Sequence, residues 1–143
     1  MNTQVVTLEV NKEGIAIVSL SNPPVNAHSQ LLLSEVAWTF DTISDREDIK
    51  IAILTGAGKC FCAGADIKER MATDPQPGDH WQNSRRAREA YHSIMECQKP
   101  VVAALNGPAL GGGLALAASC DILLASELGL SLIHISEPTR LGM

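Results

Sequence analysis

Two short glycine-containing segments carry the residues of this sequence that could do chemistry. They are Lys59–Asp66 (KCFCAGAD) and Asn106–Leu114 (NGPALGGGL). Each follows an apolar run of strand length and opens a segment expected to be helical. Backbone N–H groups at a helix start have no intrahelical partner, and glycine lets a ligand approach the backbone closely. Both segments could therefore supply backbone hydrogen-bond donors to a bound group.

The second segment partly matches two phosphate-binding motifs, and neither fits. Gly107 and Gly112 have the spacing of a P-loop, but Gly113 stands where that motif needs a lysine. The glycines also do not form the Gly-x-Gly-x-x-Gly pattern of a dinucleotide-binding turn. Close packing of a helix on a sheet would use the same three glycines, and that alternative stays open.

The position of the two segments suggests a shared target. Strand-to-helix turns in a parallel sheet end at the same edge of that sheet. One N–H from each turn could then point at one atom. Two fixed donors of this kind stabilise a carbonyl oxygen that becomes negative during a reaction.

Apolar periodicity predicts the elements that must position these turns. After an N-terminal hairpin, strands alternate with helices, so an α/β fold with mainly parallel pairing is expected. The apolar runs at 49–55 and 101–105 are typical of strands buried on both faces. The predicted strands are Val5–Val10, Ile15–Leu20, Ile49–Thr55, Val101–Leu105 and Ile122–Ala125; the predicted helices are Ser29–Ser44, Asp66–Ala72, Trp81–Cys97 and Gly111–Ser119, with a loop at 73–79.

Composition limits the function classes. The 143 residues are 45% hydrophobic, 19% charged and only 3% aromatic, which predicts one domain with an aliphatic core. A net charge of -5 argues against nucleic-acid binding. No apolar run reaches the ~20 residues of a membrane helix, and no signal segment opens the chain, so a cytoplasmic protein is expected. We interpret the four cysteines as small apolar residues rather than zinc ligands: Cys60, Cys62, Cys97 and Cys120.

A set of motifs in one order resembles the crotonase family, the enoyl-CoA hydratases and isomerases. The motifs are FCAGADIK at 61–68, KPVVAALNG at 99–107, GGG at 111–113, CDI at 120–122 and NPPVNA at 22–27. The resemblance covers residues 4 to about 127. It implies a spiral of β-β-α units, truncated here because the family's chain is about twice as long. It also implies assembly as a homotrimer or hexamer.

The resemblance assigns roles by position. The backbone N–H groups of Ala65 and Gly112 would form an oxyanion hole for the thioester oxygen of an acyl-CoA. Lys68 would lie near the phosphates of coenzyme A, which enters as part of the substrate, so neither a separate cofactor nor a metal is expected. The implied coenzyme A site comprises Val25, Asn26, Ala27, Ala63, Ala65, Asp66, Ile67, Lys68 and Gly112.

One position departs from the family pattern. Many hydratases of the family have a glutamate two positions after the third glycine, where this chain has Ala115. Hydration needs both a base and an acid, so the absence of this carboxylate favours isomerisation or another one-acid reaction. The enzyme is the interpretation for the longer parent protein, whereas the 143-residue chain itself is expected to be a truncated, catalytically inert fragment; a non-enzymatic acyl-CoA binder is the other alternative.

The C-terminal segment needs a separate interpretation. Leu130–Arg140 (LSLIHISEPTR) matches the translation of a transposase adapter used to build sequencing libraries, so residues 130–143 are interpreted as a non-native tail. Residues 1–129 would be the N-terminal part of a crotonase-like acyl-CoA-binding domain. His134 and Glu137 therefore receive no functional weight.

The remaining polar candidates have simpler interpretations. Asp66 is expected to cap the helix that it opens, and Asp121 to end a helix or fix a loop. A short basic run is expected to be a solvated helix face rather than a phosphate site, and it comprises Arg85, Arg86 and Arg88. Three histidines are expected to be non-catalytic: His28, His80 and His92.

Overall fold

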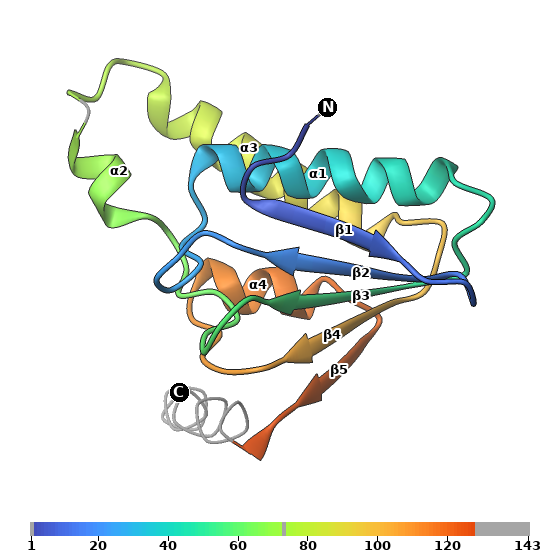
Figure 1. The fold of residues 1–143 in the computed structure, drawn as a ribbon. Helices are drawn as coiled ribbons and strands as arrows, with labels where there is room; N and C mark the ends of the chain where they lie inside the picture. Colours follow the sequence, from blue (N-terminus) through green and yellow to red (C-terminus); the bar gives the residue numbers. More distant parts are fainter. Residues whose placement is uncertain (1, 73, 128–143) are drawn as a thin grey trace, which may run out of the picture.

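A computed structural model describes residues 2–72 and 74–127 (Figure 1). Over these residues the strands and helices alternate after an N-terminal hairpin. In chain order the elements are β1 (Val6–Val10), β2 (Ile15–Leu20), α1 (Gln30–Asp45), β3 (Ile51–Gly56), α2 (Ile67–Ala72), α3 (Asp79–Met95), β4 (Val101–Leu105), α4 (Gly112–Ala118) and β5 (Ile122–Ala125). The element types and their order agree with the sequence prediction.

The strands form one mixed sheet with the order β1-β2-β3-β4-β5. β1 pairs with β2 in antiparallel fashion, and the remaining neighbours pair in parallel, with Val18 opposite Leu54 and Leu54 opposite Ala103. The hairpin turn is fixed by Asn11, whose Oδ1 accepts the N–H groups of Glu13 and Ile15. The predicted α/β class with mainly parallel pairing is confirmed. The carboxyl ends of β2 to β5 consequently lie at one edge of the sheet.

Helix boundaries follow their capping groups. The Ser29 hydroxyl oxygen accepts the Leu32 N–H at 3.1 Å, which confirms the predicted start of α1. Helix α3 begins at Asp79 rather than at Trp81, because Gly78 takes a left-handed conformation and its carbonyl accepts the N–H of Gln82. The predicted loop at 73–79 is therefore one residue too long.

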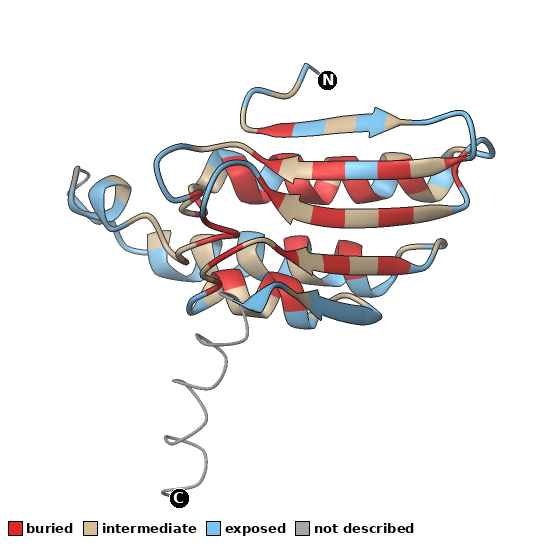
Figure 2. Ribbon diagram, turned by 60° about the horizontal axis from the view of Figure 1, so that its bottom comes forward, coloured by how far each residue is buried: buried red, intermediate tan, exposed pale blue. Residues whose placement is uncertain are grey.

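Burial on the central strands differs between their two faces. Alternate residues of β3 and β4 are fully buried, whereas those between them are only half-buried. Helices α1, α3 and α4 lie behind the sheet in Figure 2, and the alternation of colours along the strands is visible there. The prediction that these strands are buried on both faces is wrong for the second face. The reason is that these three helices all cover the same side of the sheet.

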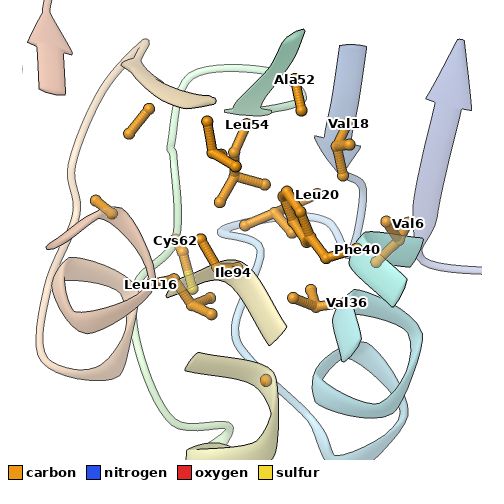
Figure 3. Packing of buried hydrophobic residues seen from close by; sticks show 14 of the residues in the cluster. Val6, Val18, Leu20, Val36, Phe40, Ala52, Leu54, Cys62, Ile94 and Leu116 are labelled. Carbon is orange, nitrogen blue, oxygen red and sulfur yellow. The ribbon is translucent and has the colours of Figure 1, made fainter. Parts of the chain in front are cut away.

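The core lies between the sheet and these helices. Figure 3 shows Leu54 of β3, Phe40 of α1, Ile94 of α3 and Leu116 of α4 converging on one cluster, with Cys62 beside them. All are buried, and the cluster is largely aliphatic, as the composition predicts. Burying each large side chain stabilises the fold by about 1.5–3 kcal/mol. This packing fixes the strand ends from which the two glycine-containing turns depart.

A buried carboxylate joins α1 to the first strand. Glu35 is 1% exposed, and its oxygens accept the N–H groups of Gln4, Val5 and Val6 at 2.8, 2.8 and 3.0 Å. Three charge-assisted bonds offset the cost of burying this charge. The sequence pattern of the helix does not reveal this role.

Candidate functional site

The turns that follow β3 and β4 contact each other directly. The N–H groups of Phe61 and Cys62 donate to the carbonyl of Pro108 at 3.0 and 3.1 Å, and the N–H of Leu110 donates to the carbonyl of Cys62 at 3.0 Å. Cys62 and Ala109 form an isolated parallel bridge. The expectation that both turns meet at one edge of the sheet is confirmed.

A cleft of about 660 Å³ opens beside the two turns, and both Ala65 and Gly112 line it. Neither the Ala65 N–H nor the Gly112 N–H donates a hydrogen bond to another residue within 2–72 or 74–127. Gly112 is the first residue of α4, a position at which the N–H has no intrahelical acceptor. Two backbone donors are thus free on one cleft wall. The lining comprises His28, Gln30, Leu33, Ala65, Asp66, Glu69, Arg70, Pro75, Asp79, His80, Asn83, Ser84, Ala87, Tyr91 and Gly112.

Close packing requires two of the three adjacent glycines. A Cβ on Gly113 would lie 2.1 Å from the carbonyl oxygen of Cys62 in the facing turn. A Cβ on Gly112 would lie 1.9 Å from Nε2 of His28. Close packing is therefore found at Gly112 and Gly113, against the His28 ring and the facing turn rather than against the sheet, whereas a Cβ on Gly111 would meet no atom of the described residues within 4 Å. At Gly112, close packing occurs together with an N–H group that has no acceptor among the described residues.

The segment before α1 lies along the first turn. The Ala63 N–H donates to the carbonyl of Val25 at 3.0 Å, and the His28 N–H donates to the carbonyl of Gly64 at 2.8 Å. Asn26 is buried with a positive φ of 53°, and its amide nitrogen donates to two carbonyls of the 57–60 loop at 2.9 and 2.8 Å. The Asn26 side chain therefore positions the loop and is not available to a ligand, whereas the Val25 side chain is exposed and His28 lines the cleft.

The predicted coenzyme A residues divide between the cleft and its surroundings. Ala65, Asp66 and Gly112 line the cleft, whereas Val25, Asn26, Ala27, Ala63, Ile67 and Lys68 are not part of its lining. Ile67 is 67% exposed, and Lys68 beside it on α2 is also exposed. The Asp66 carboxylate accepts the Glu69 N–H at 3.1 Å, which confirms its predicted capping role.

The carboxylates of the cleft are bound to backbone groups. In addition to the cap at Asp66, Glu69 accepts the N–H of Gln30 at 3.0 Å, and Asp79 accepts the N–H of Gln76 at 2.7 Å. Ala115 lies one turn into α4, half-buried and without a polar side chain. Each of these three carboxylates therefore already accepts a backbone N–H group, and position 115 adds no further acid.

His28 is the site residue that sequence reasoning missed. It lines the cleft, is 8% exposed, and its Nδ1 is buried without a hydrogen-bond partner among the described residues. Burial lowers the pKa of the imidazole, so the ring is neutral near pH 7. The neighbouring Ser29 signalled a helix start, but no local pattern placed the ring against Gly112. The contact joins residues far apart in the chain.

The remaining candidates have structural or surface positions. Asp121 accepts the N–H of Val101 at 2.8 Å and so fixes the start of β4, which is a strand end rather than the expected helix end or loop. All four cysteines are free thiols; burial raises the pKa of Cys62 to about 11 and that of Cys120 to about 12. His80 lines the cleft, whereas His92 and the three arginines of α3 are exposed. The proposed adapter-derived tail at 130–143 lies outside the described residues.

The described part of the chain contains neither a metal-binding cluster nor a membrane-spanning helix. Within residues 2–72 and 74–127, His, Cys, Asp and Glu side chains form no cluster of three that could hold a metal ion. In the same residues, no helix has both the length and the apolar character needed to cross a bilayer.

Comparison with known proteins identifies the relatives of this arrangement. The family model described as Enoyl-CoA hydratase/isomerase matches residues 10–138. A probable mitochondrial enoyl-CoA hydratase of Dictyostelium discoideum is 39% identical over 127 residues, covering 87% of this chain and 44% of the relative. A probable enoyl-CoA hydratase of Bacillus subtilis is 36% identical, with 79% and 43% covered.

Solved structures agree with the sequence relatives. The enoyl-CoA hydratase from Bacillus anthracis superimposes with a TM-score of 0.82 at 32% identity, over 88% of this chain and 49% of that chain. An enoyl-CoA hydratase/carnithine racemase from Magnetospirillum magneticum gives a TM-score of 0.82 at 36% identity, with 90% and 48% covered. The expected crotonase fold is confirmed. The chain spans a little under half the length of each of these four relatives.

Proposed function

Because the chain belongs to the enoyl-CoA hydratase/isomerase family, we propose that its cleft binds the thioester group of an acyl-CoA. The observation that carries the proposal is that the N–H groups of Ala65 and Gly112, both at the cleft, have no acceptor among residues 2–72 and 74–127. A thioester carbonyl oxygen placed between them would accept both hydrogen bonds. These donors would thus act as the oxyanion hole of the site.

The chemistry of such a site follows from the charge on that oxygen. Removing a proton from the carbon next to a thioester carbonyl moves an electron pair onto the oxygen and gives an enolate. Two fixed backbone donors stabilise the negative oxygen more than the neutral one, and losing one such donor costs about a hundred- to a thousandfold in rate. The family affiliation makes hydration or double-bond isomerisation of an enoyl-CoA the proposed reaction of the whole protein.

The carboxylates decide between these reactions. Ala115 has no side chain that could transfer a proton, and the carboxylates of Asp66 and Glu69 already accept backbone N–H groups. This arrangement favours a one-acid isomerisation over hydration. It also supports a second candidate, in which the chain as given binds acyl-CoA without converting it.

The rest of the proposal concerns the coenzyme and the assembly. Lys68 is exposed one turn beyond the donor residue Ala65, where its ammonium could meet the phosphates of coenzyme A. The backbone of Val25 to Ala27 lies along the same turn and is proposed to meet the remainder of the coenzyme. A trimeric or hexameric assembly and a cytoplasmic location remain predictions.

Calorimetry with butyryl-CoA and with free coenzyme A tests the binding proposal. We expect butyryl-CoA to bind more tightly than coenzyme A, because only the thioester supplies the carbonyl oxygen. Two matched variants isolate the donor: Gly112→Ala and Gly112→Pro both add a Cβ against His28, but only proline removes the N–H. Gly112→Pro should bind butyryl-CoA more weakly than Gly112→Ala. Equal affinities in the two variants would contradict the role of this N–H.

Turnover assays separate the two candidates. Purified chain is incubated with crotonyl-CoA and with a 3-enoyl-CoA, and the loss of the conjugated double bond or its formation is followed by absorbance. Isomerisation that Gly112→Pro reduces about a hundredfold relative to Gly112→Ala supports the enzyme. Binding without turnover of either compound supports the non-converting binder.

A further inference from the structure

His28 lies between the two free backbone donors. Its backbone forms an isolated parallel bridge with Ala65, and its N–H donates to the carbonyl of Gly64 at 2.8 Å. Its ring packs directly on Gly112, so closely that an added Cβ there would lie 1.9 Å from Nε2. His28, Ala65 and Gly112 all line the same cleft. The imidazole is therefore adjacent to the position proposed for the thioester oxygen.

The hydrogen-bonding state of the imidazole can be derived from its surroundings. Nδ1 is buried and has no partner within the described residues, and burial keeps the ring in its neutral form by lowering its pKa. A neutral imidazole carries one N–H. A buried lone pair without a partner costs less than a buried N–H without one. The favoured tautomer therefore carries its proton on Nε2, the nitrogen beside Gly112.

We propose that the Nε2–H of His28 is a third hydrogen-bond donor to the thioester oxygen, alongside the N–H groups of Ala65 and Gly112. This rests on the proposed binding of an acyl-CoA in the cleft and makes His28 a further catalytic residue there. The imidazole forms and breaks no covalent bond and keeps its proton. Because the donor is neutral and already in position, its bond strengthens as the oxygen becomes negative.

The neighbouring carboxylates cannot take this role. The Asp66 and Glu69 side chains accept backbone N–H groups, and an ionised carboxylate has no proton to donate. A carboxylate next to the developing oxyanion would repel it. A neutral donor at position 28 avoids that repulsion.

Nitrogen-15 NMR of the chain with labelled histidine tests the contact directly. In the free chain, the His28 signals should report the Nε2–H tautomer. Saturating butyryl-CoA should shift the His28 Nε2–H resonance, while free coenzyme A should leave it in place. The exposed His92 on α3 provides an internal reference that neither compound moves.

Variants measure what the contact contributes. We expect His28→Leu to raise the dissociation constant of butyryl-CoA about three- to tenfold, the value of one hydrogen bond, without changing that of coenzyme A. His28→Gln keeps a donor and should recover part of the affinity, and His92→Leu should change neither constant. If His28→Leu does not fold, the NMR shift in the unmodified chain decides.

Two negative results have different meanings. Butyryl-CoA that binds with unchanged His28 resonances would overturn the role of His28 and leave the proposed function intact. A failure of the unmodified chain to bind butyryl-CoA more tightly than coenzyme A would overturn both.

Discussion

Two regions of the molecule bury polar groups in opposite ways. Where α1 meets β1, Glu35 is 1% exposed and all of its buried charge is matched by three backbone N–H groups. At the cleft, the N–H groups of Ala65 and Gly112 and the Nδ1 of His28 have no partner among the described residues. In the first region the buried carboxylate has hydrogen-bond partners within the chain, whereas in the second region donors and an acceptor have none among the described residues.

The difference separates structural from functional polarity. A buried polar group without a partner destabilises a fold, so such groups are rare and those that occur need an explanation. Here one such buried atom, the Nδ1 of His28, belongs to a residue that lines the cleft, next to the N–H groups of the half-buried Ala65 and Gly112. Capacity for hydrogen bonds that the protein does not use itself is what a polar ligand requires.

The largest expected effect on the free energy of unfolding comes from removing the Glu35 carboxylate. Glu35→Ala should lower the free energy of unfolding by about 2–4 kcal/mol, because it leaves the N–H groups of Gln4, Val5 and Val6 without their acceptor. Urea titration followed by circular dichroism measures the change. Asp41→Ala, on the exposed side of the same helix, is the matched control and should change stability by less than about 0.5 kcal/mol.

A smaller effect of opposite sign is expected at the cleft. His28→Leu replaces a poorly satisfied polar ring by an apolar side chain, so the free energy of unfolding should stay the same or rise by up to about 1 kcal/mol. The same urea titration measures it. A loss comparable with that of Glu35→Ala would mean that His28 has a partner essential for folding, and the contrast between the two regions would fail.

The pH dependence of stability sharpens the same contrast. The folded state holds the His28 pKa below its ordinary value of about 6.5, so the unfolded chain binds the proton more readily. Stability should therefore be fully present above pH 6.5 and fall as the pH decreases toward the folded-state pKa. Unfolding titrations of His28→Leu should give a flatter curve between about pH 7.5 and 5. Parallel curves for the two proteins would contradict the neutral, buried ring.

The smallest effect concerns two weakly polar thiols, the buried Cys62 and the half-buried Cys120. With pKa values of about 11 and 12, Cys62 and Cys120 are almost entirely protonated at pH 8. Alkylation by iodoacetamide, followed by mass spectrometry, should modify both slowly in the native chain and quickly in urea. The expected slowing is at least about a hundredfold. Native rates equal to those in urea would show that these side chains are not protected.

The sequence was sufficient for the order of elements, because apolar periods and glycine-rich turns are local signals. It also brought the two glycine-containing turns together, since turns after parallel strands share an edge, and the family resemblance then assigned Ala65 and Gly112 within them. It could not show that the ring of His28 packs on Gly112, or that the Glu35 carboxylate binds the backbone at the start of β1. Both depend on contacts between distant residues. One-sided burial of β3 was missed because an apolar strand does not reveal which faces are covered.

The direct backbone contact between the two turns has a consequence for how the family can vary. Phe61, Cys62 and Leu110 connect the turns through N–H and carbonyl groups, which every residue except proline possesses in full. The spacing of the two donors is therefore set by the main chain, and it depends on the glycines at 64, 107 and 113, where an added Cβ would collide with the backbone of the facing turn. The distance between the Ala65 and Gly112 donors is thus expected to respond more to substitution of a packed glycine than to exchange of a polar side chain elsewhere in the cleft.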